Sequence, residues 1–452
     1  MPSVAFHTLG CKVNHYETES IWQLFKAQGY ERRSFEAQAD VYIINTCTVT
    51  NTSDQKSRQI IRRAIRLNPE AVICVAGCYA QTSPAEVLSI PGVDIVIGTR
   101  DHARLLSYVA QYQREREPIN GVSDIMKAKV FEEMDVPSFT DRTRASLKIQ
   151  EGCNNFCTFC IIPWARGLLR SRAPEAVIRQ AQELVDAGYK EIVLTGIHTA
   201  GYGEDMDGYH FSDLLRNLET GVVGLKRLRI SSIEASQITD SVIDVVGRSE
   251  VIARHLHIPL QAGSDTVLER MHRKYKTAFF ADKVERLRKA LPDFALTSDV
   301  IVGFPGETED EFQETCRFIE RMRFSELHVF PYSQRTGTPA ATMPGQVDEA
   351  VKHDRVVRLI ALSNRLSEDY AGRYWGKTLD VIPEEPLNHA ESNGYYVGFT
   401  SNYLKVKFAA DSRDIVGQLV PVRITKAGYP LCEGKMSDSP IDFSAVTSKT
   451  VE

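Results

Sequence analysis

Apolar runs alternate with amphipathic stretches over residues 1–112 of the chain. A short continuous apolar run is typical of a strand buried in a parallel sheet, and apolar residues at helical spacing are typical of a helix packed on one face. The predicted strands are Val4–Leu9, Val41–Asn45, Val72–Ala76 and Ile95–Ile97, and the predicted helices include Glu17–Gln28 and Asp54–Leu67. The pattern therefore predicts a doubly wound parallel α/β domain.

A second alternation of strands and helices occupies residues 142–370. Its predicted strands are Ser146–Gln150, Glu191–Thr195, Arg227–Ser231, His255–Leu260, Leu296–Val302 and Glu326–Phe330. The predicted helices between them include Pro174–Ala187, Thr239–Val246, Lys276–Ala290 and Thr308–Met322. Because parallel neighbours need long right-handed crossovers, this order predicts a curved (β/α) array. The strands are too few for a closed eight-stranded barrel, so we expect a partial (β/α)6 barrel.

Two further parts of the chain have a different pattern of polar and apolar residues. Residues 113–141 are polar and predict a connector between the first two domains. Residues 371–436 contain short alternating segments separated by Gly, Asn and Asp, namely GKTLDVIP, YYVGFT, LKVKFA and LVPVRITKAG. Short alternating segments of this kind are typical of a small antiparallel β-barrel. Residues 437–452 are polar and predict a tail.

The composition narrows the class of protein. A length of 452 residues agrees with about three domains of roughly 150 residues each. With 43% apolar and 25% charged residues, the chain is not collagen-like, coiled-coil or disordered. It shows neither a secretory leader nor an apolar stretch long enough to span a bilayer. We therefore expect a soluble, cytoplasmic protein without a membrane partner, whose nine cysteines serve metal binding or catalysis instead of disulfides.

Three cysteines form a compact motif at the start of the second domain. Cys153, Cys157 and Cys160 make a C-x3-C-x2-C run directly after the first strand, at the end of a (β/α) array where active sites lie. Three thiolates on one loop can bind three irons of a 4Fe–4S cluster and leave the fourth iron open to a substrate. The alternative is a zinc site, which needs a fourth ligand, and the closest candidate is His198, one strand later.

This motif, with an aromatic residue at Phe159 and a (β/α)6 array behind it, resembles the radical S-adenosylmethionine superfamily. The resemblance implies that the cluster binds S-adenosylmethionine and, with one electron from a donor protein or reductant, cleaves it to a 5′-deoxyadenosyl radical. It places Phe159 beside the adenine and Thr195 and Gly196 at the amino group. Ser232 and Glu234 would bond the ribose, although a serine there could instead cap a helix. Gln261 belongs to a segment that resembles the wall of the cofactor pocket, and His255 and His257 are expected in the core or that wall and not as metal ligands.

Three other cysteines each follow a predicted strand of the first domain: Cys11, Cys47 and Cys78. Loops at the carboxyl ends of parallel strands converge, so these residues can meet, although scattered buried cysteines are also common. The segments TLGCKVNHYETE, INTCTVT and AGCYAQ resemble the N-terminal domain of methylthiotransferases. That resemblance implies a second, auxiliary 4Fe–4S cluster on these three residues, and a C-terminal barrel similar to the TRAM domain. Cys74, Cys316 and Cys432 are expected to be structural.

The family resemblance implies a reaction. One S-adenosylmethionine methylates sulfur held at the auxiliary cluster, a second provides the radical, and the methylthio group replaces a hydrogen on carbon, so no side-chain general base is expected. The family acts on tRNA carrying isopentenyl-adenosine, on tRNA carrying threonylcarbamoyl-adenosine, or on a ribosomal protein aspartate. LGCKVNHYET and Arg166 in IIPWARG most resemble the second branch, which modifies C2 of adenosine 37 in the anticodon stem-loop. A non-catalytic iron–sulfur RNA-binding protein is the alternative from another class.

The net charge of −5 means that RNA must be bound through a local basic patch, and no DNA partner is expected. Arg58, Arg62 and Arg66 lie one helical turn apart in a segment without acidic residues, which predicts either a phosphate-binding face or an ordinary solvated face. Arg166 is a further candidate for RNA contact, and Arg270 to Lys276 is a second basic stretch. The aromatic residues of the barrel could stack on bases or fill its core; they are Tyr395, Tyr396, Phe399 and Tyr403.

Overall fold

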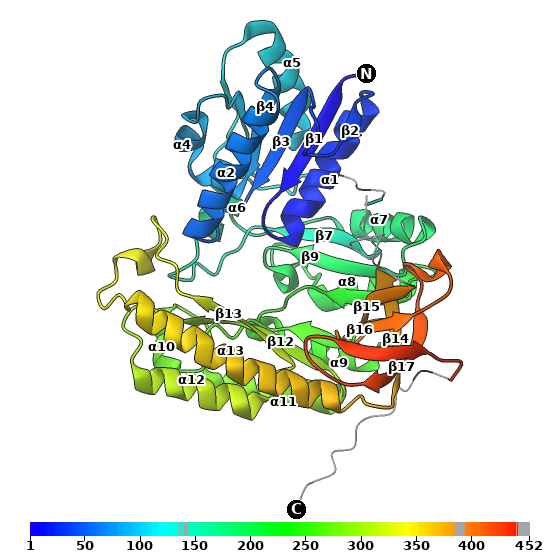
Figure 1. The fold of residues 1–452 in the computed structure, drawn as a ribbon. Coiled ribbons are helices and arrows are strands. Elements are labelled where there is room, and N and C mark those ends of the chain that lie inside the picture. Colours follow the sequence, from blue (N-terminus) through cyan, green and yellow to red (C-terminus); the bar gives the residue numbers. More distant parts are fainter. Residues whose placement is uncertain (135, 137, 140–142, 385–393, 440, 442–452) are drawn as a thin grey trace, which may run out of the picture.

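A computed structural model describes residues 1–134, 136, 138–139, 143–384, 394–439 and 441. Parts of the predicted connector and most of the predicted tail therefore lie outside the described residues. Figure 1 shows the N-terminal domain above a central array of strands and helices, with a small β-barrel beside the array. The predicted fold class is confirmed in all three parts.

The N-terminal domain is a parallel sheet of strand order β2-β1-β3-β4-β5-β6. Its strands are β1 (Ser3–Thr8), β2 (Glu31–Arg33), β3 (Val41–Thr46), β4 (Val72–Gly77), β5 (Ile95–Val96) and β6 (Ile119–Asn120). Its helices are α1 (Lys12–Ala27), α2 (Asn51–Leu67), α3 (Cys78–Thr82), α4 (Pro84–Leu88) and α5 (Leu105–Glu115). Strands β3 and β4 are buried along their whole length, as their continuous apolar runs predict.

Strand β2 was not predicted, and helix α1 and the connector differ from the sequence prediction. Helix α1 begins at Lys12, directly after Cys11, and not at Glu17, because its first turn buries Val13 and Asn14 against the rest of the protein. The connector predicted to begin at residue 113 starts too early. Helix α5 continues to Glu115, and β6 then pairs Ile119 with Ile95 at the edge of the sheet. A strand of two residues is too short to leave a periodic signal in the sequence.

The central array has six parallel strands, as predicted: β7 (Ala145–Glu151), β9 (Glu191–Gly196), β10 (Arg227–Ile230), β11 (His255–His257), β12 (Ala295–Val302) and β13 (Glu326–Pro331). Strand β11 is shorter than predicted, since Pro259 has no N–H to donate. Between β10 and β11 the array continues through one isolated bridge, Leu228 to Ile252. A short strand β8 (Arg170–Ser171) runs antiparallel to the end of β7.

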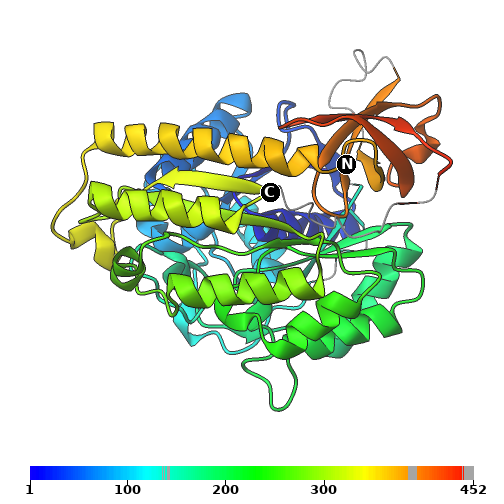
Figure 2. The same cartoon turned by 90° about the horizontal axis from the view of Figure 1, so that it is seen from below.

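Helices connect and cover these strands. They are α6 (Ile162–Arg166), α7 (Pro174–Asp186), α8 (Phe211–Gly221), α9 (Asp240–Arg248), α10 (Asp265–Arg270), α11 (Thr277–Ala290), α12 (Glu309–Met322) and α13 (Glu349–Gly372). A continuous core of buried aliphatic and aromatic side chains, among them Leu147, Leu194, Leu228 and Leu256, fills the space between strands and helices. Helix α13 was not predicted. It leads from the array into the C-terminal barrel, which Figure 2 shows at the end of this helix.

The C-terminal barrel is closed, in the order β14-β15-β16-β18-β17. Its strands are β14 (Thr378–Glu384), β15 (Tyr395–Thr400), β16 (Lys405–Ala409), β17 (Val420–Lys426) and β18 (Cys432–Met436). The prediction missed β18, since Cys432 is the only residue of this strand that is buried. Tyr396 fills the barrel core, whereas Tyr395 is exposed.

A buried cluster of charges attaches the barrel to the central array. Glu191 of β9 accepts hydrogen bonds from Arg227 (3.0 Å) and Arg229 (2.7 Å) of β10. Arg229 also donates to the carbonyl of Thr400 in the barrel (3.0 Å). Burial alone would raise the pKa of Glu191, but the two guanidinium groups lower it to about 2. No helix in the described part of the chain is long and apolar enough to cross a membrane.

Candidate functional site

Cys11, Cys47 and Cys78 meet at one edge of the N-terminal sheet. Each follows one of the adjacent strands β1, β3 and β4, so their loops lie side by side, as the sheet rule predicts. Gly10 makes the close approach possible: a Cβ at this position would lie 2.9 Å from Cys47 Cβ. Its φ of +102° is also one that only glycine adopts readily. Burial raises the pKa of the Cys78 thiol, and the neighbouring Cys11 and Cys47 raise it further.

Arg166, at the end of α6 in the central array, enters this N-terminal site. Its Nε donates to Cys78 Sγ (3.2 Å), and its Nη2 donates to Asn14 Oδ1 (2.6 Å). It also pairs with Glu17 of α1 and with Glu151 of β7 (3.3 Å). The residue is fully buried, so the prediction that Arg166 contacts RNA is wrong. The guanidinium is held inside the protein by two carboxylates and a cysteine sulfur.

Lys148 completes this buried network. Its Nζ lies 2.8 Å from Glu17 Oε1 and also pairs with Glu151. Burial alone would raise the pKa of Glu17, but Arg166 and Lys148 together hold it well below its ordinary value. Two cations and two carboxylates therefore compensate one another between α1 of the N-terminal domain and β7 and α6 of the central array.

Cys153, Cys157 and Cys160 lie on the loop between β7 and α6. Gly152, with a φ of +74°, turns the chain out of β7, and a Cβ there would lie 2.0 Å from the Leu168 carbonyl oxygen. Arg273 donates from Nη1 to Cys157 Sγ (3.3 Å). Among the described residues, each cysteine triad thus has a buried guanidinium that donates to one of its sulfurs. Such a cation compensates the negative charge of thiolates.

The donor sets fit 4Fe–4S clusters better than single metal ions. In the described part of the chain, the one group of three possible ligands whose donor atoms all lie within 4.8 Å of one another is His257, Asp299 and His328. Neither cysteine triad is that tightly gathered, as expected when each thiolate binds a different iron. Burial raises the pKa of Cys78 and Cys160 to about 12 and that of Cys153 to about 11, so iron binding must displace protons.

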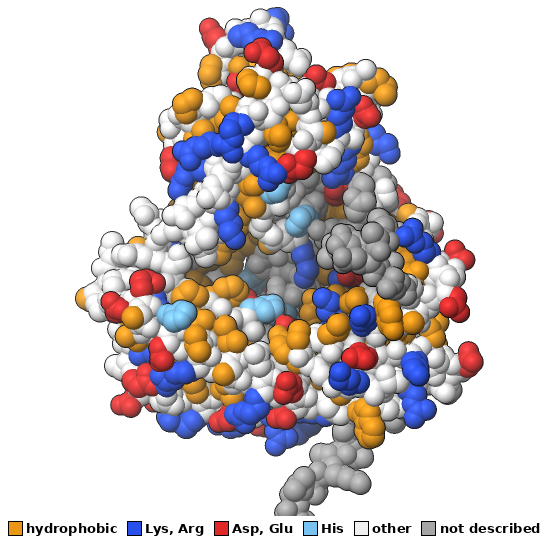
Figure 3. Space-filling model, in the orientation of Figure 1, with side chains coloured by type: hydrophobic (Ala, Val, Ile, Leu, Met, Phe, Trp, Pro, Cys, Tyr) orange, Lys and Arg blue, Asp and Glu red, His pale blue; other side chains and the backbone are white. Residues whose placement is uncertain are grey.

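His198 lies beside Cys153 in the structure although the two residues are far apart in the sequence. Its Nδ1 lies 3.7 Å from Cys153 Sγ and 3.1 Å from Asn155 Nδ2. In the sequence, His198 is only a distant candidate for a fourth zinc ligand, because it lies one strand later. The neighbouring strands β7 and β9 bring the loops of Cys153 and His198 together. Figure 3 shows that the face between the N-terminal domain and the central array is hollowed, with histidine and basic side chains on its walls.

Comparison with known proteins decides the family. Residues 3–98 match the uncharacterized protein family UPF0004, and residues 147–319 match the radical SAM superfamily. The threonylcarbamoyladenosine tRNA methylthiotransferase MtaB of Bacillus subtilis (strain 168) is 69% identical over 96% of this chain and 96% of its own length. The chain belongs to the threonylcarbamoyladenosine tRNA methylthiotransferase family. The resemblance drawn from its cysteine segments is confirmed.

More distant proteins share less with this methylthiotransferase. A tRNA-2-methylthio-N(6)-dimethylallyladenosine synthase of Desulforamulus reducens is 34% identical over 95% of this chain and 94% of its own length. The solved structure of the radical S-adenosylmethionine methyltransferase TsrM from Kitasatospora setae has a TM-score of 0.56 and 15% identity, and covers 75% of this chain and 77% of its own. The similarity to TsrM supports the fold alone. As a radical SAM enzyme, the methylthiotransferase uses a 4Fe–4S cluster and S-adenosylmethionine.

The residues predicted to bind S-adenosylmethionine follow successive strands of the array, on the same edge as the second cysteine triad. Thr195 and Gly196 end β9, and a Cβ on Gly196 would lie 2.9 Å from Gln150 Oε1. Ser232 and Glu234 follow β10; the alternative that a serine there caps a helix is wrong, because Thr239 caps α9. Gln261 follows β11. The ring of Phe159 packs edge-on against that of Phe304, with 6.5 Å between the ring centroids.

Glu234 has a partner that was not predicted. It forms an ion pair with Arg273, the residue that donates to Cys157. Arg270 pairs with Glu311 (2.8 Å), so both arginines of the second basic stretch have carboxylate partners, whereas its two lysines, Lys274 and Lys276, are exposed. In the first stretch, Arg58 is bonded to Tyr79 (2.9 Å) and Glu86. Arg62 and Arg66 are exposed on α2.

Replacing Arg166 with Met tests the buried network. The variant leaves Glu17 and Glu151 with Lys148 alone and removes the donor to Asn14 and Cys78. Breaking a buried ion pair by removing one partner costs about 3–5 kcal/mol, so we expect the free energy of unfolding to fall by that amount. Anaerobic chemical denaturation measures it. The exposed Arg62→Met is the control and should change stability by about 0.5 kcal/mol or less; equal stability of both variants contradicts the account.

Proposed function

We propose that this enzyme converts N6-threonylcarbamoyladenosine at tRNA position 37 to 2-methylthio-N6-threonylcarbamoyladenosine, with two S-adenosylmethionine molecules used per product. The observation that carries the proposal is the hydrogen bond from Arg166 of the central array to Cys78 of the N-terminal domain. This bond joins the auxiliary triad to the domain that carries the radical triad, which supports a reaction that uses both. The 69% identical relative bears the name of this activity, whereas the dimethylallyladenosine synthases are half as similar.

The chemistry explains why a carbon radical is needed. An aromatic C–H bond is far too weakly acidic for a side chain of pKa near 7 to deprotonate, so no general base is assigned. S-adenosylmethionine bound at a cluster supplies a carbon radical, which activates such a bond. The chain then has two tasks, which are to hold the substrate carbon between the triads and to keep water out.

We assign the cluster and cofactor contacts as the sequence predicts. Cys11, Cys47 and Cys78 would hold the auxiliary 4Fe–4S cluster, and Cys153, Cys157 and Cys160 the cluster that binds S-adenosylmethionine. The proposed cofactor contacts are Phe159, Thr195, Gly196, Ser232, Glu234 and Gln261. Support comes from their common edge of the array and from the guanidinium group beside each triad. Reduction of the clusters would require an electron donor, and a tRNA substrate supports a cytoplasmic location.

The function is tested on the tRNA nucleosides of cells that lack the gene. Mass spectrometry should show the loss of 2-methylthio-N6-threonylcarbamoyladenosine and the accumulation of its precursor, and both should revert when the gene is restored. The methylthiolated isopentenyl nucleoside is the internal control and should not change. If that nucleoside disappears instead, or if no tRNA nucleoside changes, the proposed substrate is wrong.

The division of labour between the triads predicts two different defects. Cys153→Ala should abolish formation of 5′-deoxyadenosine from S-adenosylmethionine, because it removes a ligand of the radical cluster. Cys47→Ala should retain this cleavage and lose the methylthiolated product. Each variant should lose up to half of the roughly eight irons per chain expected from two clusters. Chromatography of both reaction products measures the difference. Full product from either variant, or cleavage lost in both, contradicts the assignment.

We also propose that Arg62 and Arg66 contact the tRNA backbone, since both are exposed on α2, the helix that follows Cys47. Changing both to Gln should weaken tRNA binding. It should also lower the slope of log Kd against log salt concentration by roughly 1.4 to 1.8, the value for about two phosphate contacts. Filter binding over a salt series measures this. The control is the double variant Arg179→Gln and Arg216→Gln, which changes arginines on α7 and α8. If the slope of the α2 variant is unchanged, Arg62 and Arg66 belong to an ordinary solvated face.

A further inference from the structure

A cavity of about 870 Å³ lies between the N-terminal domain and the central array. Its walls come from α2, α3 and α4 on one side and from α6 and the loop after β13 on the other. Two of the lining residues adjoin the cysteine triads: Gln81 is on the same short helix as Cys78, and Ile161 directly follows Cys160. A ligand in this cavity would therefore lie beside the proposed reaction site.

Trp164 of α6 presents an aromatic ring to this cavity. Its indole is 39% exposed, and its Nε1 has no hydrogen-bond partner among the described residues. Phe156, on the loop of the radical triad, makes a T-shaped contact with it, with 5.6 Å between the ring centroids. Such a contact covers at most one face of the indole. A planar ligand can therefore stack on the other face.

The charged side chains that line the cavity leave no surplus of positive charge. Arg335 forms an ion pair with Asp54, and Arg58 forms one with Glu86 (3.0 Å). Asp124 is a third carboxylate in the wall. Because three carboxylates accompany two guanidinium groups, the cavity does not favour a phosphate. It favours an uncharged planar group.

The wall formed by α2 connects the cavity to the proposed RNA-binding face. Arg58 lines the cavity, and Arg62, proposed to contact the tRNA backbone, lies one helical turn further along α2. Gln55 of α2 and Ser83, which precedes α4, also line the cavity, and their side chains have no hydrogen-bond partner in the described part of the chain. Free amide and hydroxyl groups of this kind can bond the edge of a nucleobase.

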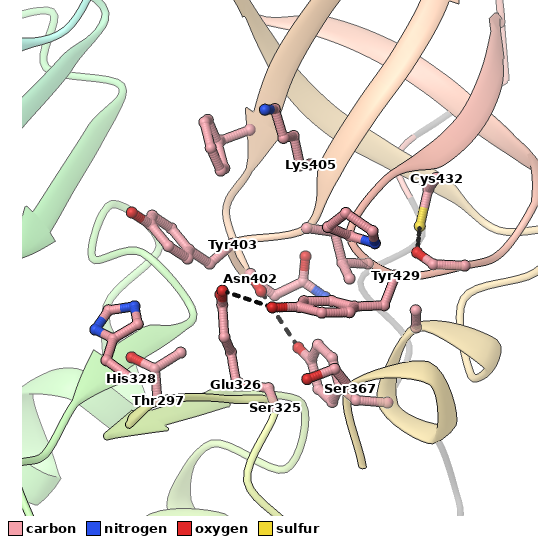
Figure 4. A pocket seen from close by; sticks show the side chains of 16 residues that line it. Thr297, Ser325, Glu326, His328, Ser367, Asn402, Tyr403, Lys405, Tyr429 and Cys432 are labelled. Atoms are coloured by element: carbon pink, nitrogen blue, oxygen red, sulfur yellow. Dashed lines mark hydrogen bonds between the residues drawn. The ribbon is translucent and has the colours of Figure 1, made fainter. Parts of the chain in front are cut away.

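A smaller cavity, of about 300 Å³, lies between the central array and the C-terminal barrel (Figure 4). Its Tyr403 ring already stacks on His255 (4.2 Å between centroids) and on Phe399 (5.0 Å). The Tyr429 hydroxyl donates to Glu326 (3.1 Å). Since these aromatic side chains already have partners in the protein, the cavity beside Trp164 is better suited to receive a base.

We propose that Trp164 is the stacking platform for the base of a nucleotide that flanks adenosine 37 in the anticodon loop. Proteins that recognise single-stranded loops stack their splayed bases on aromatic side chains. The inference rests on the proposed function: if the target carbon lies between the triads, the neighbouring nucleotides of the loop lie within reach of a cavity that adjoins both. Trp164 then positions the substrate without taking part in the chemistry.

S-adenosylmethionine is another ligand with a planar base. Its proposed contacts, among them Thr195, Ser232 and Gln261, follow strands β9 to β11, and none of the six lines this cavity in the described structure. The cavity therefore favours the RNA over the cofactor.

The experiment measures binding of anticodon stem-loop RNAs to the full-length enzyme with its clusters, by fluorescence anisotropy. All RNAs carry threonylcarbamoyladenosine at position 37; one is intact, and two others lack the base at position 36 or at position 38. Trp164→Ala should weaken binding of the intact RNA about fivefold to a hundredfold, the loss of one base stacked on an aromatic side chain. The unmodified enzyme should bind one abasic RNA less tightly, and Trp164→Ala should cause no further loss with that RNA.

Two controls accompany this variant. Trp164→Phe keeps an aromatic face and should retain most of the affinity for the intact RNA. Phe279→Ala removes a ring of similar exposure, 41%, on α11, far from the N-terminal domain in Figure 1, and should bind every RNA as the unmodified enzyme does. The iron content of each variant verifies that the clusters are intact.

The possible outcomes separate the inference from the proposed function. If Trp164→Ala weakens the intact and both abasic RNAs equally, or weakens none, no flanking base stacks on Trp164 and the inference is wrong. It is also wrong if the variant loses affinity for S-adenosylmethionine, measured by equilibrium dialysis, and not for RNA. If the unmodified enzyme methylthiolates isopentenyl-adenosine and not threonylcarbamoyladenosine, the proposed function fails, whereas stacking of a flanking base is still measurable.

Discussion

The buried ion network of Glu17, Lys148, Glu151 and Arg166 determines how the two halves of the site face each other. Its members come from α1 in one domain and from β7 and α6 in the other. Buried charges are costly unless they are fully paired, so the network is satisfied in one relative arrangement of the domains and penalised in others. The same arginine donates to Cys78. Domain docking and the electrostatics of the auxiliary triad therefore depend on one side chain.

A second buried cluster attaches the C-terminal barrel to the array. Arg227 and Arg229, which pair with Glu191, donate to backbone carbonyls of the barrel, and Tyr403 of the barrel stacks on His255. The barrel thus provides one wall of a cavity whose other wall is formed by strands β12 and β13 and helix α13.

Much of the fold follows from periodicity. The strands of the N-terminal sheet and of the central array lie within one or two residues of their predicted starts, because continuous apolar runs in parallel sheets are buried on both faces. Convergence of Cys11, Cys47 and Cys78 also follows, since loops after adjacent parallel strands share one edge. Strands β2, β6, β8 and β18 and helix α13 were not predicted. These strands are short or mostly exposed, and α13 mixes buried polar with exposed apolar residues.

The sequence alone determined the cysteine spacing, the order of the three domains and hence the family chemistry, because these are properties of local pattern. Only the tertiary structure decided the partners of the charged residues. Arg166, expected on RNA, is buried beside Cys78; Arg273, expected on a basic surface, donates to Cys157; and His198 reaches Cys153 across a strand. An arginine at the end of a short helix has the same sequence signal whether it faces solvent or a carboxylate from another domain. Long-range pairing is set by docking, which local pattern does not encode.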